Sequence, residues 1–315
     1  MKAPAFWDKN GIKPKLLAPA ACVYSLVTQQ RMKNIGYKSK LPVICVGNLV
    51  AGGAGKTPTA IKLGKMIQTS GKKINFLASG YNGKINIVAK VVENDPHKYG
   101  DEAVVLSAVA PTWIGKDRAE AAQLAEMDGA EVLVLDDGYQ NPTLQKDFSV
   151  VVVDAEYGFG NGKVIPAGPL RETVEDGLAR ADAILIIGDG KPSLPKTKIP
   201  IFKAKVEISF PEVLKEERIV PFCGLARPEK FFNSLKKAGL DLADEISFPD
   251  HHPYLESDIK AVLGIASKFG AVVVTTEKDF VKLPQKIKML VHIVKMDLVI
   301  ENEDKLKTLM FKKIK

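Results

Sequence analysis

The sequence predicts an α/β protein of the phosphate-loop NTPase type, with a mostly parallel sheet flanked by helices and a smaller α/β second lobe. Three observations lead to this prediction. Short β-branched apolar runs alternate with longer stretches of helical pattern, as in a βαβ series. A glycine-rich loop ending in Gly55, Lys56 and Thr57 follows the first apolar run. A later apolar run ends in two carboxylates, Asp136 and Asp137.

The first predicted unit, residues 1–195, follows this alternation along the chain. Strands separated by helices pair in parallel, because each crossover returns the chain to the same edge of the sheet. The strands are expected at residues 42–47, 73–78, 132–135, 149–153 and 183–187. The helices are expected at about 56–69, 101–108 and 117–127.

A change of texture near residue 195 predicts a second, smaller α/β unit, residues 196–300. The stretch 191–200 is rich in proline and lysine, which is typical of linkers and hinges. Beyond it, strands are expected near 201–206, 219–222 and 271–275, and helices at about 228–238 and 255–269. The last residues, 301–315, predict a basic helix that packs back on the first unit.

Composition narrows the class of partner. Of the 315 residues, 46% are hydrophobic and 26% are charged, and the formal net charge is +8. This charge favours anionic partners, although a lysine-rich solvated surface gives the same balance. No arginine-rich run is interleaved with aromatic residues, so we expect no nucleic acid partner. Cys22, Cys45 and Cys223 form no C-x-x-C pair, which argues against a zinc site or disulfide framework and fits a reducing cytoplasm.

The N-terminal segment Leu16–Val27 is mostly apolar and is flanked by Lys13, Lys15, Arg31 and Lys33. It is shorter than the run of about 18 apolar residues that a membrane-spanning helix requires. Its pattern fits two interpretations equally well. One is a helix lying in a membrane interface, and the other is a terminal helix docked on the protein's own core.

The glycine-rich loop predicts a nucleoside triphosphate site. Glycine lets backbone N–H groups approach phosphate oxygens, and the helix N-terminus adds a partial positive charge. Lys56 would reach the β- and γ-phosphates, and Thr57 would ligate Mg²⁺. Val50 stands where the strict pattern has glycine, but Gly52 and Gly53 and the strand–loop–helix context compensate. The candidate nucleotide-binding residues are Gly52, Gly53, Ala54, Gly55, Lys56, Thr57 and Pro58.

Asp136 and Asp137 supply the second acid that a phosphate loop needs for its metal ion, because ligands gather at the carboxyl ends of parallel strands. Three classes of protein use such a pair. A GTPase would carry Asn-Lys-x-Asp, whereas residues 276–279 read Thr-Glu-Lys-Asp. A partitioning ATPase would carry a lysine where Ala51 stands. A kinase for a small or lipid acceptor therefore remains.

Further motifs in a fixed order run along nearly the whole chain. They are Pro4–Trp7, Gly47–Pro58, Gly100–Ala103, Asp117–Arg118, Asp136–Gln140, Gly160–Gly162, Pro166–Glu172, Arg227–Phe232, Phe248–Tyr254 and Thr275–Asp279. By their number and order, the sequence resembles the tetraacyldisaccharide 4′-kinase family, the lipid A 4′-kinases of Gram-negative bacteria.

The resemblance implies ATP and Mg²⁺ as cosubstrates and an acylated glucosamine disaccharide 1-phosphate, phosphorylated at its 4′-hydroxyl, as acceptor. It implies attachment to the cytoplasmic face of the inner membrane through a helix at about 12–33, which favours the membrane interpretation of Leu16–Val27. It also implies that a two-stranded hinge joins a phosphate-loop core to the smaller lobe. We expect a monomer.

Residue roles follow from the matching motifs. Asp101 is the candidate base, because a sugar hydroxyl is a poor nucleophile until its proton is removed. His251 would hold Asp101 ionised and oriented, with His252 as the open alternative. Glu102 would assist the metal or the base, beside the metal candidates Thr57, Asp136 and Asp137. Arg171 is a candidate for transition-state charge. Acceptor contacts are expected from Asn48, Tyr81, Arg118, Gln140 and Glu172.

Two departures weaken the acceptor assignments. Ser79 replaces an arginine that the family often has before Gly80 and Tyr81, and Asn141 replaces a histidine. Thr275 and Thr276 end a predicted strand and either face the nucleotide or cap a helix.

Two other functions stay open at this point. One is a phosphate-loop ATPase that regulates a membrane partner, and the other is a kinase of another small acceptor.

Overall fold

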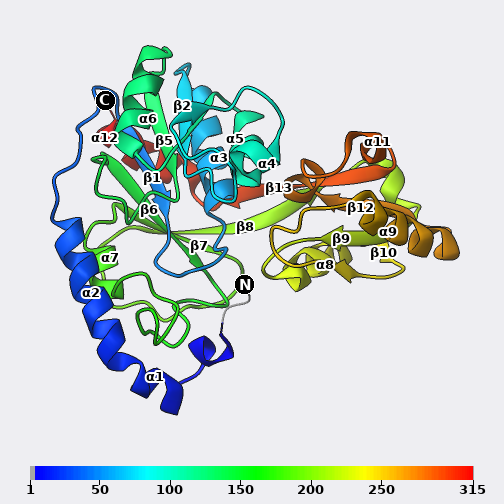
Figure 1. Cartoon of the computed structure of the whole chain (residues 1–315), viewed down its shortest axis with the longest axis horizontal. Helices are drawn as coiled ribbons and strands as arrows, with labels where there is room; N and C mark the ends of the chain where they lie inside the picture. The colour runs from blue at the N-terminus through cyan, green and yellow to red at the C-terminus, as the bar shows by residue number, and fades with distance from the viewer. Residues whose placement is uncertain (1–3, 315) are drawn as a thin grey trace.

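The computed structural model describes residues 4–314, which form a larger and a smaller lobe joined by two long strands (Figure 1). Residues 1–3 of the predicted first unit and residue 315 of the predicted C-terminal helix lie outside the described residues. The strands of the larger lobe are β1 (Val43–Gly47), β2 (Ile74–Ala78), β3 (Ala89–Lys90), β4 (Thr112–Ile114), β5 (Val132–Asp136), β6 (Phe148–Asp154) and β7 (Ala183–Ile187). Its helices are η1 (Ala5–Asp8), α1 (Ile12–Leu16), α2 (Ala18–Met32), α3 (Lys56–Gln68), α4 (Pro96–Tyr99), α5 (Asp101–Ser107), α6 (Arg118–Met127), α7 (Val174–Leu178) and α12 (Glu303–Lys313).

The smaller lobe is built from elements near the C-terminal end of the chain. They are η2 (Glu212–Lys215), β9 (Arg218–Cys223), α8 (Pro228–Lys237), β10 (Asp241–Leu242), β11 (Ile246–Ser247), α9 (Glu256–Phe269), β12 (Val272–Thr276), α10 (Glu277–Phe280) and α11 (Gln285–Lys288). The strands β8 (Ile201–Ser209) and β13 (Val291–Ile300) connect this lobe to the larger one.

Strand β1 lies at the centre of the larger sheet, because β5 pairs with one of its edges and β6 with the other. β2 and β4 extend the sheet beyond β5, and β7 extends it beyond β6, all in parallel. β1, β5 and β6 are buried along their whole length, as expected for a parallel sheet with helices on both faces. The predicted mostly parallel sheet is confirmed. The register pairs Val46 of β1 with Asp136 of β5. The phosphate loop and the carboxylate pair therefore lie together at the carboxyl ends of these two parallel strands.

Helices cover both faces of this sheet and bury two apolar clusters. On one face, Leu63 and Ile67 lie one helical turn apart on α3 and pack in the same cluster as Leu306 and Met310 of α12. On the other face, small residues of α6 such as Ala122 let that helix approach the strands closely. The C-terminal helix is thus part of the core of the larger lobe.

The two lobes share one sheet, and this changes the predicted boundary near residue 195. Strand β8 pairs in parallel with β7 over residues 201–204 and then antiparallel with β13 over 204–209. The sequence predicts that this strand belongs to the second unit, because the proline-rich stretch before it has the composition of a linker. The structure shows that this stretch is a connection within the larger lobe, since β8 starts by pairing there. The connection between lobes is the β8–β13 pair.

In the smaller lobe, β12 lies between β9 and β13 and pairs in parallel with both. Helices α8 and α9 cover this small sheet. Phe222 of β9 and Ile259 of α9 are fully buried in one cluster, and Val274 of β12 and Phe231 of α8 are buried in another. The smaller lobe therefore has its own apolar core and holds its loops independently of the phosphate loop.

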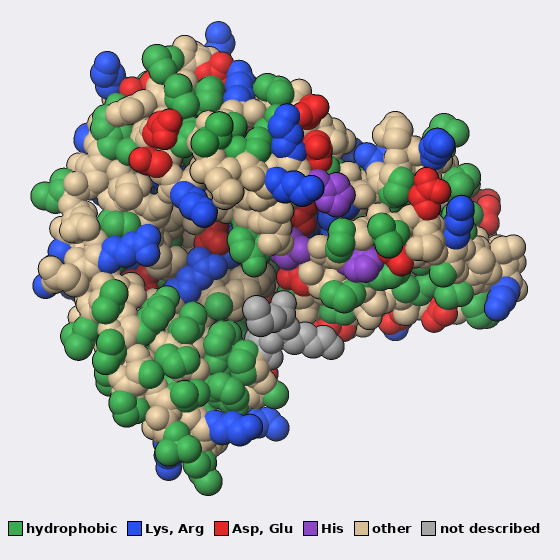
Figure 2. Space-filling view, viewed as in Figure 1, with side chains coloured by type: hydrophobic (Ala, Val, Ile, Leu, Met, Phe, Trp, Pro, Cys, Tyr) green, Lys and Arg blue, Asp and Glu red, His purple; other side chains and the backbone are tan. Residues whose placement is uncertain are grey.

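Helices α1 and α2 lie along the outside of the larger lobe, and most of their apolar side chains are exposed. Ile12 and Leu16 are 77% and 74% exposed, Val23 and Val27 are also exposed, and Ala21 is the single buried residue of α2. Figure 2 shows hydrophobic side chains gathered at this end of the molecule. Ala21 belongs to the apolar core of the larger lobe and Leu17 packs against the same cluster, so this segment docks on the lobe through a narrow strip and leaves most of its apolar surface exposed. Attachment to a membrane stays a prediction. Within residues 4–314, no helix combines the length and apolarity needed to cross a membrane.

An ion cluster around the buried carboxylate of Asp154, the last residue of β6, joins the lobes. Its carboxylate accepts hydrogen bonds from Lys230 Nζ at 2.9 and 2.8 Å and from Arg227 Nη1 at 3.2 Å, both at the start of α8. The Arg227 guanidinium also lies over the Tyr157 ring, 4.3 Å from its centroid. Burial alone would raise the pKa of Asp154, but Lys230 and Arg227 outweigh it and lower the pKa below its ordinary value.

We expect Asp154→Asn to lower the free energy of unfolding at pH 7 by about 2 kcal/mol, because charge-assisted hydrogen bonds of this kind contribute about 1.5–3 kcal/mol. Since the folded pKa of Asp154 is depressed, its contribution is complete above the unfolded pKa, about 4, and is lost as pH falls through the folded pKa. Urea unfolding at several pH values measures both effects. Asp189→Asn is the control, because its pair with Lys237 across the lobes is exposed. Equal destabilisation by both variants would contradict a role specific to the ion cluster around Asp154.

Candidate active site

The phosphate loop connects β1 to α3 and is held in shape by its own backbone and side chains. Gly55, with φ of 87°, and Gly52, with φ of 127°, occupy conformations that side chains disfavour. The carbonyl of Gly52 accepts hydrogen bonds from Lys56 Nζ and from Asn48 Nδ2, each at 3.3 Å. The loop is thus set up to present its amides, and the lysine lies folded over it.

Asp136 and Thr57 form the part of the site that suits a metal ion. Thr57 Oγ1 donates to one carboxylate oxygen of Asp136 at 2.8 Å. The other oxygen, Oδ1, is buried and has no hydrogen-bond partner among residues 4–314. Burial, followed by the carboxylates of Glu102 and Asp137, raises the pKa of Asp136 to about 7. The oxygen atoms of Thr57 and Asp136 are of the kind that Mg²⁺ prefers, and the charge of Glu102 acts on Asp136.

Asp137 lies between two cations. Arg171 donates to both of its carboxylate oxygens, at 2.7 and 3.2 Å, and Lys56 Nζ lies 3.5 Å from Oδ2. Although burial would raise the pKa of Asp137, Lys56 and Arg171 lower it. Arg171 Nη1 also donates to Gln140 Oε1 at 3.3 Å. Asp137 therefore holds the lysine of the phosphate loop and a forked guanidinium on the same side of the loop.

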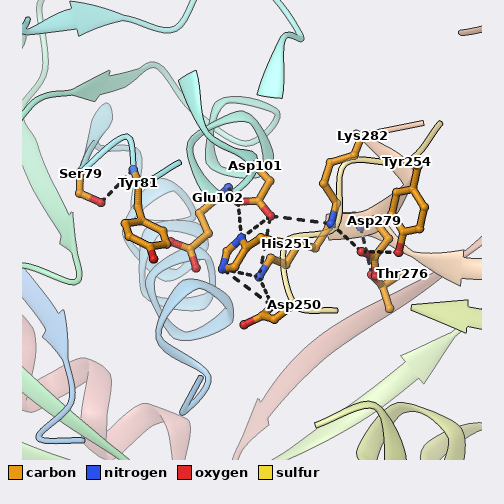
Figure 3. A network of polar contacts seen from close by, with 11 residues as sticks. Ser79, Tyr81, Asp101, Glu102, Asp250, His251, Tyr254, Thr276, Asp279 and Lys282 are labelled. Carbon is orange, nitrogen blue, oxygen red and sulfur yellow. Dashed lines mark hydrogen bonds and ion pairs between the residues drawn. The ribbon is translucent and has the colours of Figure 1, made fainter. Parts of the chain in front are cut away.

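Asp101 meets His251 across the boundary between the lobes (Figure 3). Asp101 begins α5 of the larger lobe, and His251 lies on the loop after β11 of the smaller lobe. The two carboxylate oxygens lie 3.1 and 2.9 Å from His251 Nδ1. His252 instead contacts Asp258 within its own lobe, at 2.9 Å from Nε2 to Oδ2. The structure thus decides which histidine pairs with Asp101, and Figure 2 shows histidines where the lobes meet.

The surroundings of Asp101 keep it ionised. It is almost fully buried, which would raise its pKa, but the hydrogen bond to His251 and the ammonium groups of Lys278 and Lys282 lower the pKa below its ordinary value. Sequence reasoning missed both lysines as partners of Asp101, because Asp101 belongs to the other lobe and is distant in the chain. The available signal was a run of charges directly after a predicted buried strand.

Three residues predicted to contact the acceptor are buried in the structure. Arg118 is buried, and its Nη1 donates to the backbone carbonyls of Ala78, at 2.7 Å, and Gly115. Glu172 is buried in an ion pair with Arg180 at 2.7 Å. Asn48 is fully buried under the phosphate loop. Asn48 Oδ1 and Arg118 Nε are buried and have no hydrogen-bond partner among the described residues. Contact of these three side chains with the acceptor stays a prediction, which their burial weakens.

Of the other predicted contact residues, one is exposed beside the Asp101–His251 pair and the rest form hydrogen bonds within the protein. Tyr81 is exposed and meets the His251 ring edge to face, with centroids 5.7 Å apart. Gln140 Nε2 donates to Glu172 at 2.9 Å and to the backbone of Asn48, which links the loop to the carboxylate motif. Thr276 caps α10 by accepting from Asp279 N at 3.1 Å, so the capping alternative is correct for this threonine. Thr275 Oγ1 donates to the Phe222 carbonyl and is fully buried, so it does not face a nucleotide.

The two departures from the family pattern lie in local turns. Ser79 Oγ accepts from Tyr81 N at 3.2 Å, and Asn141 Oδ1 accepts from Thr143 N at 2.9 Å. Each side chain stabilises its own turn. Neither supplies the cation that the more common residue would bring to the site.

The family model described as tetraacyldisaccharide-1-P 4′-kinase matches residues 14–315. The chain belongs to this family. A tetraacyldisaccharide 4′-kinase of Paramagnetospirillum magneticum is 43% identical over 308 residues, which cover 95% of this chain and 94% of the relative. One of Rhodospirillum rubrum is 43% identical over 313 residues, covering 96% and 94%. The resemblance stated from the motifs is confirmed.

A solved structure agrees with the fold. The crystal structure of LpxK from Aquifex aeolicus in complex with ATP is 26% identical to this chain, with a TM-score of 0.80, and covers 96% of this chain and all of that one. That protein binds ATP. This chain has the same fold, with a phosphate loop at the carboxyl end of its central strand β1. ATP binding by the family is thus supported by structure as well as by motif.

Proposed function

We propose that this protein transfers the γ-phosphoryl group of ATP to the 4′-hydroxyl of a tetraacylated glucosamine disaccharide 1-phosphate, a step of lipid A biosynthesis. The observation that carries the proposal is the junction of the two lobes. There Asp101 contacts His251, and the neighbouring Glu102 lies within range of the charges of Lys56 and Asp137 at the phosphate loop. Membership of the kinase family supports the choice of acceptor.

ATP binding follows from the phosphate loop. Its amides and Lys56 would bind the β- and γ-phosphates, and charge neutralisation together with positioning supplies most of the catalysis of phosphoryl transfer. Bound Mg²⁺ would be held by Thr57 and Asp136, assisted by Glu102, and would neutralise negative charge on the phosphates. Arg171, which Asp137 holds beside Lys56, adds a forked donor for the charge on the transferred group.

The acceptor is activated by Asp101. As the bond between the 4′-oxygen and the γ-phosphorus forms, the bond from that phosphorus to the β,γ-bridging oxygen of ATP breaks, ADP leaves, and the hydroxyl proton passes to Asp101. His251 fixes the orientation of the carboxylate through the contact at Nδ1. Tyr81 and Gln140 stay candidates for contact with the sugar.

An assay of γ-phosphate transfer tests the proposal. Purified protein with Mg²⁺ and ATP labelled in the γ-phosphate is incubated with the tetraacylated disaccharide 1-phosphate, and the lipid is separated and counted. We expect label in a bisphosphorylated glycolipid. Label released only as inorganic phosphate, at a rate that a protein partner increases, would instead support a regulatory ATPase. Label on a water-soluble alcohol, without any on the lipid, would support another small-molecule kinase.

We also propose that α1 and α2 attach the protein to the cytoplasmic face of the inner membrane, where ATP is available. The exposed apolar side chains of these helices lie at one end of the molecule, and the basic residues Lys13, Lys15, Arg31 and Lys33 flank them. An apolar face with cationic flanks inserts into the boundary of an anionic bilayer.

The double variant Leu16→Glu, Val23→Glu is expected to lower binding to anionic lipid vesicles by about a hundredfold, because burying each apolar side chain contributes about 1.5–3 kcal/mol. Vesicle co-sedimentation measures the change. Transfer to detergent-dispersed acceptor should stay within threefold of the wild type, since both residues lie outside the junction of the lobes. Val92→Glu, Met127→Glu is the matched control, because both of its residues are exposed elsewhere. Equal loss of binding in the two double variants would refute attachment through α1 and α2.

A further inference from the structure

Lys278, the second residue of α10, lies beside the far nitrogen of the His251 ring. Its Nζ is 3.4 Å from His251 Nε2, 3.4 Å from Asp250 Oδ1 and 3.8 Å from Asp101 Oδ2. One ammonium therefore contacts the histidine and two carboxylates, one of them from the other lobe. The polar network of which it is a part is drawn in Figure 3.

Donor and acceptor chemistry selects one form of the His251 ring. The Asp101 carboxylate only accepts hydrogen bonds, so Nδ1 must carry a proton to satisfy it. The Lys278 ammonium only donates, so Nε2 must offer a lone pair. Both neighbours are satisfied together only by the neutral ring with its proton on Nδ1. A doubly protonated ring would place a second cation 3.4 Å from Lys278.

We propose that Lys278 is a positioning residue of the phosphoryl-transfer site, which holds His251 neutral with its proton on Nδ1 and thereby keeps the Asp101 carboxylate oriented and free to accept a proton. This inference rests on the proposed function, because it concerns the same base. Lys278 acts through His251 and Asp101 and reaches the acceptor only through them.

Asp250 shows what Lys278 prevents. Its Oδ1 lies 3.8 Å from His251 Nε2, so without the ammonium the ring would lie between two carboxylates. Asp250 could then accept a hydrogen bond from a proton on Nε2. Although burial lowers the pKa of Lys278, Asp101 and Asp250 outweigh it and raise the pKa above its ordinary value, so the group is charged at neutral pH.

Lys282 does not share this role. Its Nζ lies 2.7 Å from Asp279 Oδ1, inside the smaller lobe, and 4.0 Å from Asp101. It also lies over the Tyr254 ring, 5.1 Å from the centroid. Lys282 balances the buried Asp279 and contributes to Asp101 only at longer range. Lys278 is the lysine in contact with the histidine.

Kinetics of three variants separate positioning from stability. Lys278→Met is expected to lower kcat for phosphoryl transfer at least tenfold, with KM for ATP within twofold of the wild type, and Lys278→Arg to recover at least a third of kcat. Lys260→Met, an exposed position on α9 of the same lobe, should match the wild type. An unchanged kcat in Lys278→Met, or a loss that follows its thermal unfolding and is not rescued by arginine, would overturn the proposal.

The ring itself provides a second readout. The chain has four histidines, so ¹⁵N-histidine labelling and long-range ¹H–¹⁵N correlation resolve the state of each, with His251→Ala as the assignment control. We expect a proton on Nδ1 alone in the wild type and on Nε2, or on both nitrogens, in Lys278→Met. The same spectrum in both proteins would refute the proposal. Because the spectrum needs no turnover, wild-type protein that transfers no phosphate would disprove the proposed function and leave this result decisive for Lys278.

Discussion

Replacing Lys56 by methionine is expected to lower kcat/KM for phosphoryl transfer by about a thousandfold. The ammonium is the one side-chain cation of the phosphate loop itself, and removing a single preorganised donor from a developing charge costs about 10²–10³ in rate. Lys56 lies over the loop and pairs with Asp137 at 3.5 Å. The position that it occupies is therefore set before the nucleotide arrives.

The fold should survive this change, because Arg171 continues to pair with both oxygens of Asp137. Steady-state kinetics with the labelled acceptor measure the activity, and thermal unfolding measures the stability. Lys65→Met is the control, since Lys65 lies on the same helix with its side chain half exposed. A Lys56→Met protein that keeps more than a tenth of the wild-type kcat/KM would show that the loop does not carry the transferred phosphate.

The features that the sequence predicted correctly are those with a local signal. A glycine-rich loop between an apolar run and a helical pattern indicates a strand, a loop and a helix in that order. Lys56 and Thr57 were therefore correctly placed at the start of the helix that follows the loop. Asp136 ended a run of buried β-branched and leucine residues, and the register sets it beside β1. The meeting of Asp101 and His251, which are 150 positions apart, came from the family resemblance.

The weaker predictions concern residues whose partners are distant in the chain. Nothing local distinguishes an arginine that reaches a phosphate from one that, like Arg118, binds two carbonyls inside the fold. Glu172 is similar, because its partner Arg180 is visible only once α7 has folded. Lys278 and Lys282 were missed for the same reason. Their charge acts on Asp101 of the other lobe, and periodicity carries no information about that contact.

The predicted position of the boundary between the lobes, near residue 195, differs from the structure for another reason. Proline and lysine at 191–200 mark an exposed connection, and exposure is shared by linkers and by surface loops within a lobe. Strand β8 alternates buried and exposed residues only over its first half, where it pairs with β7. Its second half is exposed because it crosses from one lobe to the other. The amino-acid composition of this stretch indicates that it is exposed. It gives no information about the pairing of β7 with β8, which makes the sheet continuous between the lobes.

The Asp101 carboxylate leads to the second large prediction. Asp101→Asn is expected to lower kcat by about a thousandfold, because a positioned general base contributes about 10²–10⁴. The amide has nearly the same shape, so His251 keeps a partner and the lobes stay in contact. The binding of ATP, measured by titration with a fluorescent analogue, should remain within threefold of the wild type, since Asp101 lies outside the phosphate loop.

Double variants show whether Asp101 and His251 act as one unit. We expect His251→Ala to lower kcat by about tenfold to a hundredfold and the double variant Asp101→Asn, His251→Ala to be no slower than Asp101→Asn alone. Once the base is absent, orienting it has no effect, and residues that act through each other are not additive. If the two losses multiply instead, His251 acts on the reaction independently. An Asp101→Asn enzyme with wild-type kcat would mean that the acceptor proton leaves by a route that does not pass through this carboxylate.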